Sequence, residues 1–393
     1  MVSGERVVAV DRWQKLSKGF SGEVIDLGET ALLPGLVNAH CHLDYTSMAG
    51  QFASPKLFTD WLKLITTSKA EFSYSEYAES WLNGAKMLVR TGTTTVGDIE
   101  TVPELLPEVL EATPLRLISF LEMTGIRSRR QPKSILKETT ERLEGLRASG
   151  FTGGLSPHAP YSTLPELLQL SAELARQKNW LMAVHVAESS QEFEMFMRGR
   201  GEMFDWLRRN ERDMSDCGKG SPVQHLARCG ALGKNLLAIH VNYLAKTDAA
   251  LLASSKVTVV HCPRSHSFFQ HDRFPYQRFV RAGINICLGT DSLASVYQRR
   301  RQPVELSLFE EMRTFAANQP LIRPRRILDM VTVNPAGALG LKGQVGELSK
   351  RAFADIIALP FSGKSSDAYE AVLHHEGPVS ASMIKGQWAI APA

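Results

Sequence analysis

Eight short apolar segments recur along the chain, and each ends in polar or glycine-containing residues. Several are continuous apolar runs, such as VTVV within residues 256–261, rather than alternating polar and apolar positions. Continuous patterning is typical of strands that are covered on both faces, as in a parallel sheet. Amphipathic stretches at residues 104–112, 133–148, 164–178 and 249–255 predict helices between them. The eight predicted strands are residues 31–42, 93–99, 115–122, 151–158, 180–185, 236–241, 256–261 and 284–288.

Strands that alternate with helices predict an α/β fold, here a (β/α)8 barrel of TIM type over residues 34–343. The two ends of the chain differ from this pattern. ERVVAV and GEVIDL near the N-terminus, and ADIIAL and SMIKGQWAI near the C-terminus, are typical of strands. We expect residues 1–33 and 344–393 to pair into one small β-sandwich domain beside the barrel.

Composition and charge exclude several classes of partner. Lys and Arg number 45 against 41 Asp and Glu, so the net charge of +4 over 393 residues gives no support for nucleic-acid binding. No segment approaches the roughly 20 apolar residues of a membrane helix, and MVSGERVVAVDRW is polar where a signal peptide is apolar. The five cysteines form no C-x-x-C pair and are odd in number. We therefore expect a cytoplasmic protein that acts on a small molecule.

Histidines stand where predicted strands end. His40 and His42 form an H-x-H pair on the first strand, and residues i and i+2 of a strand point to the same face. His185 and His240 end the fifth and sixth strands, and Asp291 follows the eighth in LGTDS. The C-terminal ends of barrel strands converge on one mouth, so four imidazoles and a carboxylate meet there. This donor set predicts a site for a divalent metal, either zinc or ferrous iron.

Each of these residues also has a purely structural interpretation. A single histidine at a strand end is often a hydrogen-bond donor, and an aspartate after Gly-Thr is often a turn or helix cap. Their coincidence at the ends of four strands favours the metal site. Glu188 lies three residues after His185 in HVAES, where its carboxylate can carry a proton between water and substrate. The alternative for Glu188 is a first-turn helix residue favoured by the helix dipole.

Five segments, PGLVNAHCHLD, PHAPYST, HVAES, VVHCPRSH and LGTDSLAS, resemble the amidohydrolase superfamily over nearly the whole chain. They are most similar to its branch of deaminases and chlorohydrolases that act on N-heterocycles. The resemblance implies that Glu188 shuttles the proton and that His158 contacts the substrate. It also implies that His240 and Asp291 orient the attacking hydroxide, although His240 is a ligand in some relatives. The metal ligands that it implies are His40, His42, His185 and Asp291.

The resemblance further implies a single metal ion. Relatives with two metals commonly carry a carboxylated lysine at the end of strand four, whereas here that strand ends in LSPHAPYS. The ion implied is zinc, with iron as the alternative. A small β domain built from both chain ends and a homodimer are also family features. Relatives usually have about two more strands before the segment matched by GERVVAV, so either the small domain is reduced or the sequence starts late.

The implied reaction is hydrolysis of a carbon–nitrogen bond in a cyclic amidine, in which an adenine-type ring loses its amino group as ammonia. SFFQHDRFPYQRFV and GTDSLAS look most similar to bacterial aminodeoxyfutalosine deaminases of menaquinone synthesis. Deamination of S-adenosylhomocysteine or methylthioadenosine is the next alternative, followed by guanine deamination or a chlorohydrolase reaction. HCPRSH departs from the commoner H-C-P-x-S-N pattern, because His266 stands where Asn is usual.

Further residues near the predicted strand ends are candidate substrate contacts. Arg264 and Ser265 follow the seventh strand, and an arginine fork can bind a substrate carboxylate at two points. Trp61 and Phe58 either wall a ring-binding pocket or form the apolar face of a packed helix. Further arginines follow the third and eighth strands, where the alternative is a solvated helix face: Arg127, Arg129, Arg130, Arg299, Arg300 and Arg301.

Overall fold

The computed structural model describes residues 1–126, 131–298 and 304–392. Eight parallel strands within these residues form one sheet, and each strand pairs with the next along the chain. The eight predicted barrel strands are therefore confirmed, although residues 31–42 combine a strand of a second sheet with the first barrel strand. The barrel strands are β4 (Leu36–Cys41), β5 (Thr93–Glu100), β6 (Arg116–Met123), β7 (Thr152–Pro157), β8 (Met182–Val186), β9 (Leu236–His240), β10 (Thr258–His261) and β11 (Asn285–Leu288).

The barrel closes between its first and last strands. Cys41 and Asp291 form an isolated parallel bridge, and the Thr290 N–H donates to the His40 carbonyl at 3.0 Å. Gly289 permits this approach, because a Cβ there would lie 2.8 Å from the His40 carbonyl oxygen and 3.1 Å from its nitrogen. A substituted residue would therefore push β11 away from β4.

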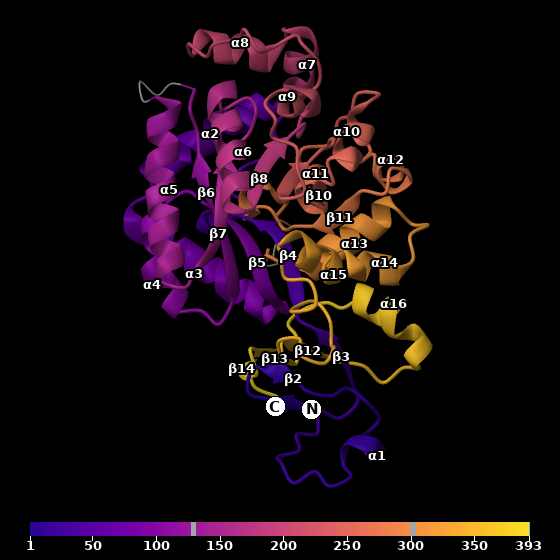
Figure 1. The fold of residues 1–393 in the computed structure, drawn as a ribbon. Coiled ribbons are helices and arrows are strands. Elements are labelled where there is room, and N and C mark those ends of the chain that lie inside the picture. The colour runs from indigo at the N-terminus through magenta and orange to yellow at the C-terminus, as the bar shows by residue number, and fades with distance from the viewer. Residues whose placement is uncertain (127–130, 299–303, 393) are drawn as a thin grey trace.

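Helices surround the barrel (Figure 1). The predicted helices at 133–148, 164–178 and 249–255 appear as α5, α6 and α10, and the prediction at 104–112 appears as α4 after a 3-10 turn. Ser73 and Ser221 cap α3 and α9 in capping boxes with Glu76 and Gln224. The helices are α1 (Trp13–Leu16), α2 (Phe58–Glu71), α3 (Tyr74–Arg90), α4 (Leu106–Glu111), α5 (Pro132–Ala148), α6 (Pro165–Lys178), α7 (Ser190–Arg198), α8 (Glu202–Arg209), α9 (Pro222–Arg228), α10 (Asp248–Ser254), α11 (Pro263–Phe268), α12 (Tyr276–Arg281), α13 (Leu308–Asn318), α14 (Pro324–Asp329), α15 (Val333–Ala338) and α16 (Ala368–Leu373).

The two chain ends build a separate antiparallel sheet, as the sequence predicts. Its order is β14 (Gln387–Ile390), β13 (Ala381–Ile384), β12 (Ile356–Pro360) and β3 (Thr30–Pro34), with a hairpin of β1 (Val2–Ser3) and β2 (Arg6–Val7) beside it. Both termini lie at this sheet, below the barrel in Figure 1. The strand expected at GEVIDL is wrong, because residues 22–27 adopt no strand and leave Val24 and Ile25 56% and 44% exposed.

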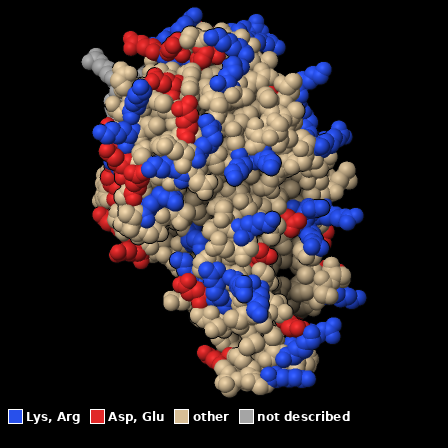
Figure 2. Space-filling view, viewed as in Figure 1, with Lys and Arg blue, Asp and Glu red and all other residues tan. Residues whose placement is uncertain are grey.

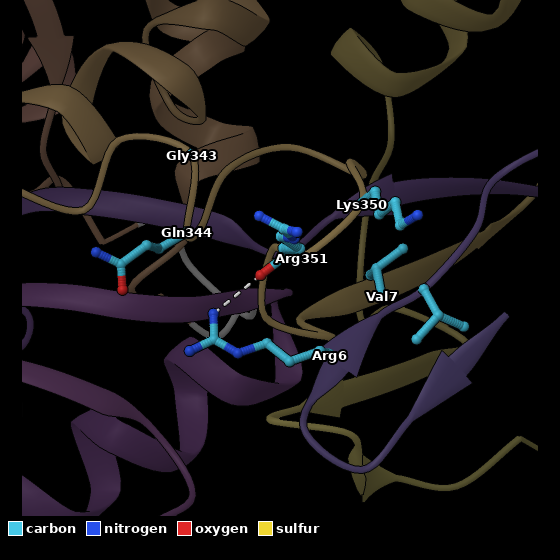
Figure 3. A pocket seen from close by; sticks show the side chains of 7 residues that line it. Arg6, Val7, Gly343, Gln344, Lys350 and Arg351 are labelled. Atoms are coloured by element: carbon cyan, nitrogen blue, oxygen red, sulfur yellow. Dashed lines mark hydrogen bonds between the residues drawn. The ribbon is translucent and has the colours of Figure 1, made fainter.

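A cavity of about 530 Å³ opens beside the hairpin and is drawn in Figure 3. Arg6 crosses it and donates to the Arg351 carbonyl at 3.0 Å, while its guanidinium lies 3.6 Å from the Phe353 ring centre. The candidate site residues lie elsewhere, at the opposite ends of the barrel strands. In Figure 2, acidic and basic side chains mix over the upper left of the visible face, and basic ones predominate lower down. None of the described helices is both long and apolar enough to cross a membrane.

Candidate metal centre and active site

The C-terminal ends of β4, β8, β9 and β11 bring the five predicted donors together. His42 Nε2 lies 3.3 Å from His185 Nε2, and Asp291 Oδ1 lies 3.5 Å from His40 Nε2. One ligand atom from each of His40, His185 and His240 lies within 4.8 Å of the others, and the same holds for His40, His42 and Asp291. The cluster lies at the end of the barrel that faces α7 in Figure 1, away from the small sheet.

The cluster fits a divalent cation. Both ring nitrogens of His40 and Nδ1 of His42 are buried without a hydrogen-bond partner among the described residues. Such a buried group costs about 1–3 kcal/mol when it stays unpaired. Burial lowers the pKa of His42, His185 and His240 well below the usual value, so these imidazoles are neutral and offer lone pairs. Neutral imidazoles with a carboxylate suit zinc or iron.

Two contacts prepare individual ligands. The His158 carbonyl lies 3.0 Å from His185 Nδ1 and can only accept, so Nδ1 carries the proton and Nε2 is free for a metal. Although burial raises the pKa of Asp291, its contact with His40 brings that pKa well below the ordinary value. The Asp291 carboxylate is therefore ionised.

Strained backbone marks the same strand ends. Ala187, His240, Val241 and Asp291 have φ angles of 51°, 72°, 47° and 54°. A left-handed conformation at a residue other than glycine costs about 1–3 kcal/mol and persists where surrounding contacts enforce it. These residues turn the chain where β8 and β9 end and just after β11. The strained positions therefore coincide with the predicted site residues.

Glu188 lies beside the histidines. Its Oε1 is 3.5 Å from His240 Nε2, and the residue is only 5% exposed. Burial raises the pKa of Glu188 well above the usual value, and Asp291 and Glu192 add to this. The Glu188 N–H donates to Glu192 Oε2 and its carbonyl accepts from Asn242 Nδ2, both at 2.9 Å. Glu192 and Asn242 are site residues that the sequence patterns did not single out.

His158 is adjacent to the cluster, with its ring centre 4.9 Å from that of His185. The Ser162 hydroxyl donates to the Ala159 carbonyl at 3.2 Å, so its oxygen accepts from His158 Nδ1 at 2.6 Å. This leaves His158 Nε2 as an acceptor, and burial lowers the pKa of His158 to about 3. Nε2 also lies 4.0 Å from Glu122 Oε2, a distance too long for a direct hydrogen bond.

The other predicted substrate contacts are Arg264, Ser265 and Trp61. Arg264 Nη1 donates to the Glu305 carbonyl at 2.7 Å and lies 3.8 Å from Glu311, so both contacts are internal. Ser265 is 1% exposed, and its hydroxyl has no partner among the described residues. Trp61 is partly buried, contacts Phe58 and Phe269, and places Nε1 3.5 Å from the Ala294 carbonyl. The clusters at Arg127, Arg129 and Arg130 and at Arg299, Arg300 and Arg301 lie outside the described residues.

Known proteins share both the sequence pattern and the fold. A 5-methylthioadenosine/S-adenosylhomocysteine deaminase of Pyrococcus furiosus is 29% identical over 328 residues, which cover 82% of this chain and 73% of that protein. The crystal structure of Helicobacter pylori aminofutalosine deaminase in complex with methylthio-coformycin matches with a TM-score of 0.86 and 22% identity, over 99% of this chain and 94% of that one. An adenosine deaminase of Xanthomonas campestris with bound zinc matches with a TM-score of 0.79 and 22% identity, over 92% and 81%.

One family model matches both the barrel and the small sheet. The match to the amidohydrolase family covers residues 31–389, from β3 through the whole barrel to β14. This confirms the resemblance expected from the sequence motifs. The chain belongs to the amidohydrolase family.

Proposed function

We propose that this protein is a metal-dependent deaminase of an adenine-type nucleoside that releases ammonia. The observation that carries the proposal is the buried group of four imidazoles and Asp291 with Glu188 beside it. The protein is a hydrolase that acts on carbon–nitrogen bonds in cyclic amidines, as the sequence predicts. The deaminases named among its relatives support the adenine-type substrate.

The residues that would hold one divalent ion are His40, His42, His185 and Asp291. Zinc is the ion we favour, since a structural neighbour was solved with zinc, and iron is the alternative. When bound, such an ion lowers the pKa of a coordinated water toward neutrality. His240 Nε2 lies 3.5 Å from Glu188 Oε1, where it can orient the attacking oxygen. A role as a further ligand is the alternative, since one of its ring nitrogens lies within 4.8 Å of those of His40 and His185.

Glu188 moves the proton in this proposal. Its carboxylate accepts a proton from the attacking water and passes it to a ring nitrogen of the substrate. The water oxygen then bonds to the carbon that carries the amino group. The proton that remains on the newly attached hydroxyl moves to the amino nitrogen, the carbon–nitrogen bond breaks, and ammonia leaves a ring carbonyl behind. Burial raises the pKa of Glu188, which helps the carboxyl group hold the proton between its two transfers.

Three other residues orient the reactants. Asp291 and His240 hydrogen-bond the attacking oxygen, and both lie within the cluster. His158 presents Nε2 as an acceptor for a donor group of the substrate, since Nδ1 is bonded to Ser162. Arg264, Ser265 and Trp61 stay candidate substrate contacts.

The substrate we favour is aminodeoxyfutalosine, which would place the protein in menaquinone synthesis in the cytoplasm. A structural neighbour is named aminofutalosine deaminase and matches over 99% of this chain, which supports this choice. S-adenosylhomocysteine and methylthioadenosine are the second candidates, because a relative at 29% identity is named for them. A chlorohydrolase reaction on the same site would release chloride instead of ammonia.

A substrate panel tests the proposal. Purified protein, loaded with zinc or with ferrous iron, is assayed for ammonia with aminodeoxyfutalosine, S-adenosylhomocysteine, methylthioadenosine, adenosine, guanine and cytosine. We expect ammonia from one adenine-type nucleoside at a kcat/KM well above the others. Release from guanine or cytosine alone, or from none of the six with metal bound, would contradict the adenine-type proposal.

A further inference from the structure

We propose that Asn242 and His266 are positioning residues that hold the backbone of Glu188 against His240. The inference rests on the proposed role of Glu188 as the proton carrier. It concerns two residues to which the mechanism above gives no role. Its basis is a chain of two hydrogen bonds that links α11 to the turn after β8.

Asn242 joins the two strand ends that meet at the site. It follows β9 and is 4% exposed, and its Nδ2 donates to the Glu188 carbonyl at 2.9 Å. Its own N–H donates to the Ala187 carbonyl, also at 2.9 Å. Asn242 therefore bonds the two residues that lead the chain out of β8.

The turns after β8 and β9 need contacts from other parts of the chain to stay in place. Ala187, His240 and Val241 all have left-handed backbone conformations, so both turns are strained. Strain of this kind persists only where other contacts enforce it. The Glu192 carboxylate holds the Glu188 N–H, and Asn242 holds the Glu188 carbonyl. The two contacts together fix where the Glu188 side chain starts, and hence its approach to His240.

His266 fixes Asn242 in turn. The residue is 9% exposed on α11, and its Nδ1 lies 3.1 Å from Asn242 Oδ1. Because an amide oxygen can only accept, His266 donates this bond, and the bond sets which end of the Asn242 amide faces Glu188. An asparagine at position 266 keeps an N–H donor at the place of the His266 Nδ1. It is also the commoner residue there in the family pattern, so it is the natural conservative variant.

The test is a set of variants assayed for kcat, KM and metal content. A misplacement of about 1 Å at a reacting group costs on the order of 100-fold in rate, so we expect Asn242→Ala to lower kcat by about 100-fold with KM nearly unchanged. His266→Ala should lower kcat less, and His266→Asn should restore it. Since His266 acts through Asn242, the double alanine variant should be no slower than Asn242→Ala.

Two controls and one independent measurement complete the design. Asn285→Ala removes a partly buried amide at the start of β11, and His225→Asn replaces a buried histidine on α9. Both residues bond to groups outside the site, so both variants should keep the wild-type kcat. Hydrogen exchange over residues 185–192 reports the backbone directly and should be faster in Asn242→Ala. The inference would be overturned if the variants raised KM instead of lowering kcat, or if the two single losses in kcat multiplied in the double variant. Unchanged hydrogen exchange in Asn242→Ala would also overturn it. If the wild-type protein deaminates none of the panel, the proposed function fails, and the exchange rates alone decide whether Asn242 holds this turn.

Discussion

Replacing Glu188 with Gln isolates the proton transfer. The side chain is 7% exposed and glutamine has nearly the same shape, while the bonds to Glu192 and Asn242 use only the Glu188 backbone. The variant therefore keeps the fold and loses only the ability to take a proton. General acid–base catalysis contributes about 10²–10⁴-fold, which is about 3–5 kcal/mol of activation free energy. We expect kcat to fall by about 10³-fold.

The assay follows ammonia release under saturating substrate, with metal content measured on the same sample. Metal binding should be unchanged, since Glu188 belongs to neither ligand triad of His40. Asp248→Asn is the matched control, because Asp248 is fully buried on α10 and bonded to Ser221 outside the site. A Glu188→Gln protein that holds its metal and keeps kcat within about fivefold of the wild type would refute the shuttle role.

Three further predictions concern the metal, the barrel closure and acid stability. Chelation should abolish activity and lower the melting temperature, and added zinc or ferrous iron should restore both. In elemental analysis, the His42→Asn variant should bind less than about a tenth of the metal that the wild type binds. Gly289→Ala should cost about 1–3 kcal/mol in urea unfolding and weaken metal binding, because the new Cβ would meet the His40 backbone; an unchanged midpoint would refute this. Burial lowers the pKa of His225 from 6.5 to about 4. As the pH falls, His225 therefore takes up a proton in the unfolded chain at a higher pH than in the folded protein. Between these values His225 alone should lower the free energy of unfolding by about 1.4 kcal/mol for each unit that the pH falls. His225→Gln should reduce the slope of a denaturation series from pH 7 to 4.5 by that amount, while the other buried histidines keep their share.

The barrel and the donor cluster follow from short-range rules. A strand covered on both faces is continuously apolar, and its end is visible where polar residues begin. His40, His42, His185, His240 and Asp291 stand at such ends, so closing the sheet into a barrel brings them to one mouth without further information. The family assignment was predictable for the same reason, since its motifs lie at these positions.

Other features depend on contacts that no pattern specifies. Residues 31–42 form one apolar run, but β3 and β4 belong to two sheets because the chain passes from one to the other at Gly35. GEVIDL has a strand-like pattern, but these residues form no strand in the described structure. Arg264 stays a candidate substrate contact, but no pattern in the sequence indicates that it also bonds the Glu305 carbonyl and lies near the Glu311 carboxylate. Asn242 was missed because its role lies in a bond between two strand ends.

The central claim is hydrolytic deamination at the metal cluster, and labelled water tests it most directly. The metal-loaded protein is incubated with the best nucleoside of the panel in water enriched in oxygen-18, and product and ammonia are quantified together. We predict one ammonia per product, one labelled oxygen in the ring carbonyl, and loss of both when the metal is removed. Product without the label, product without ammonia, or undiminished turnover by metal-free protein would contradict this account.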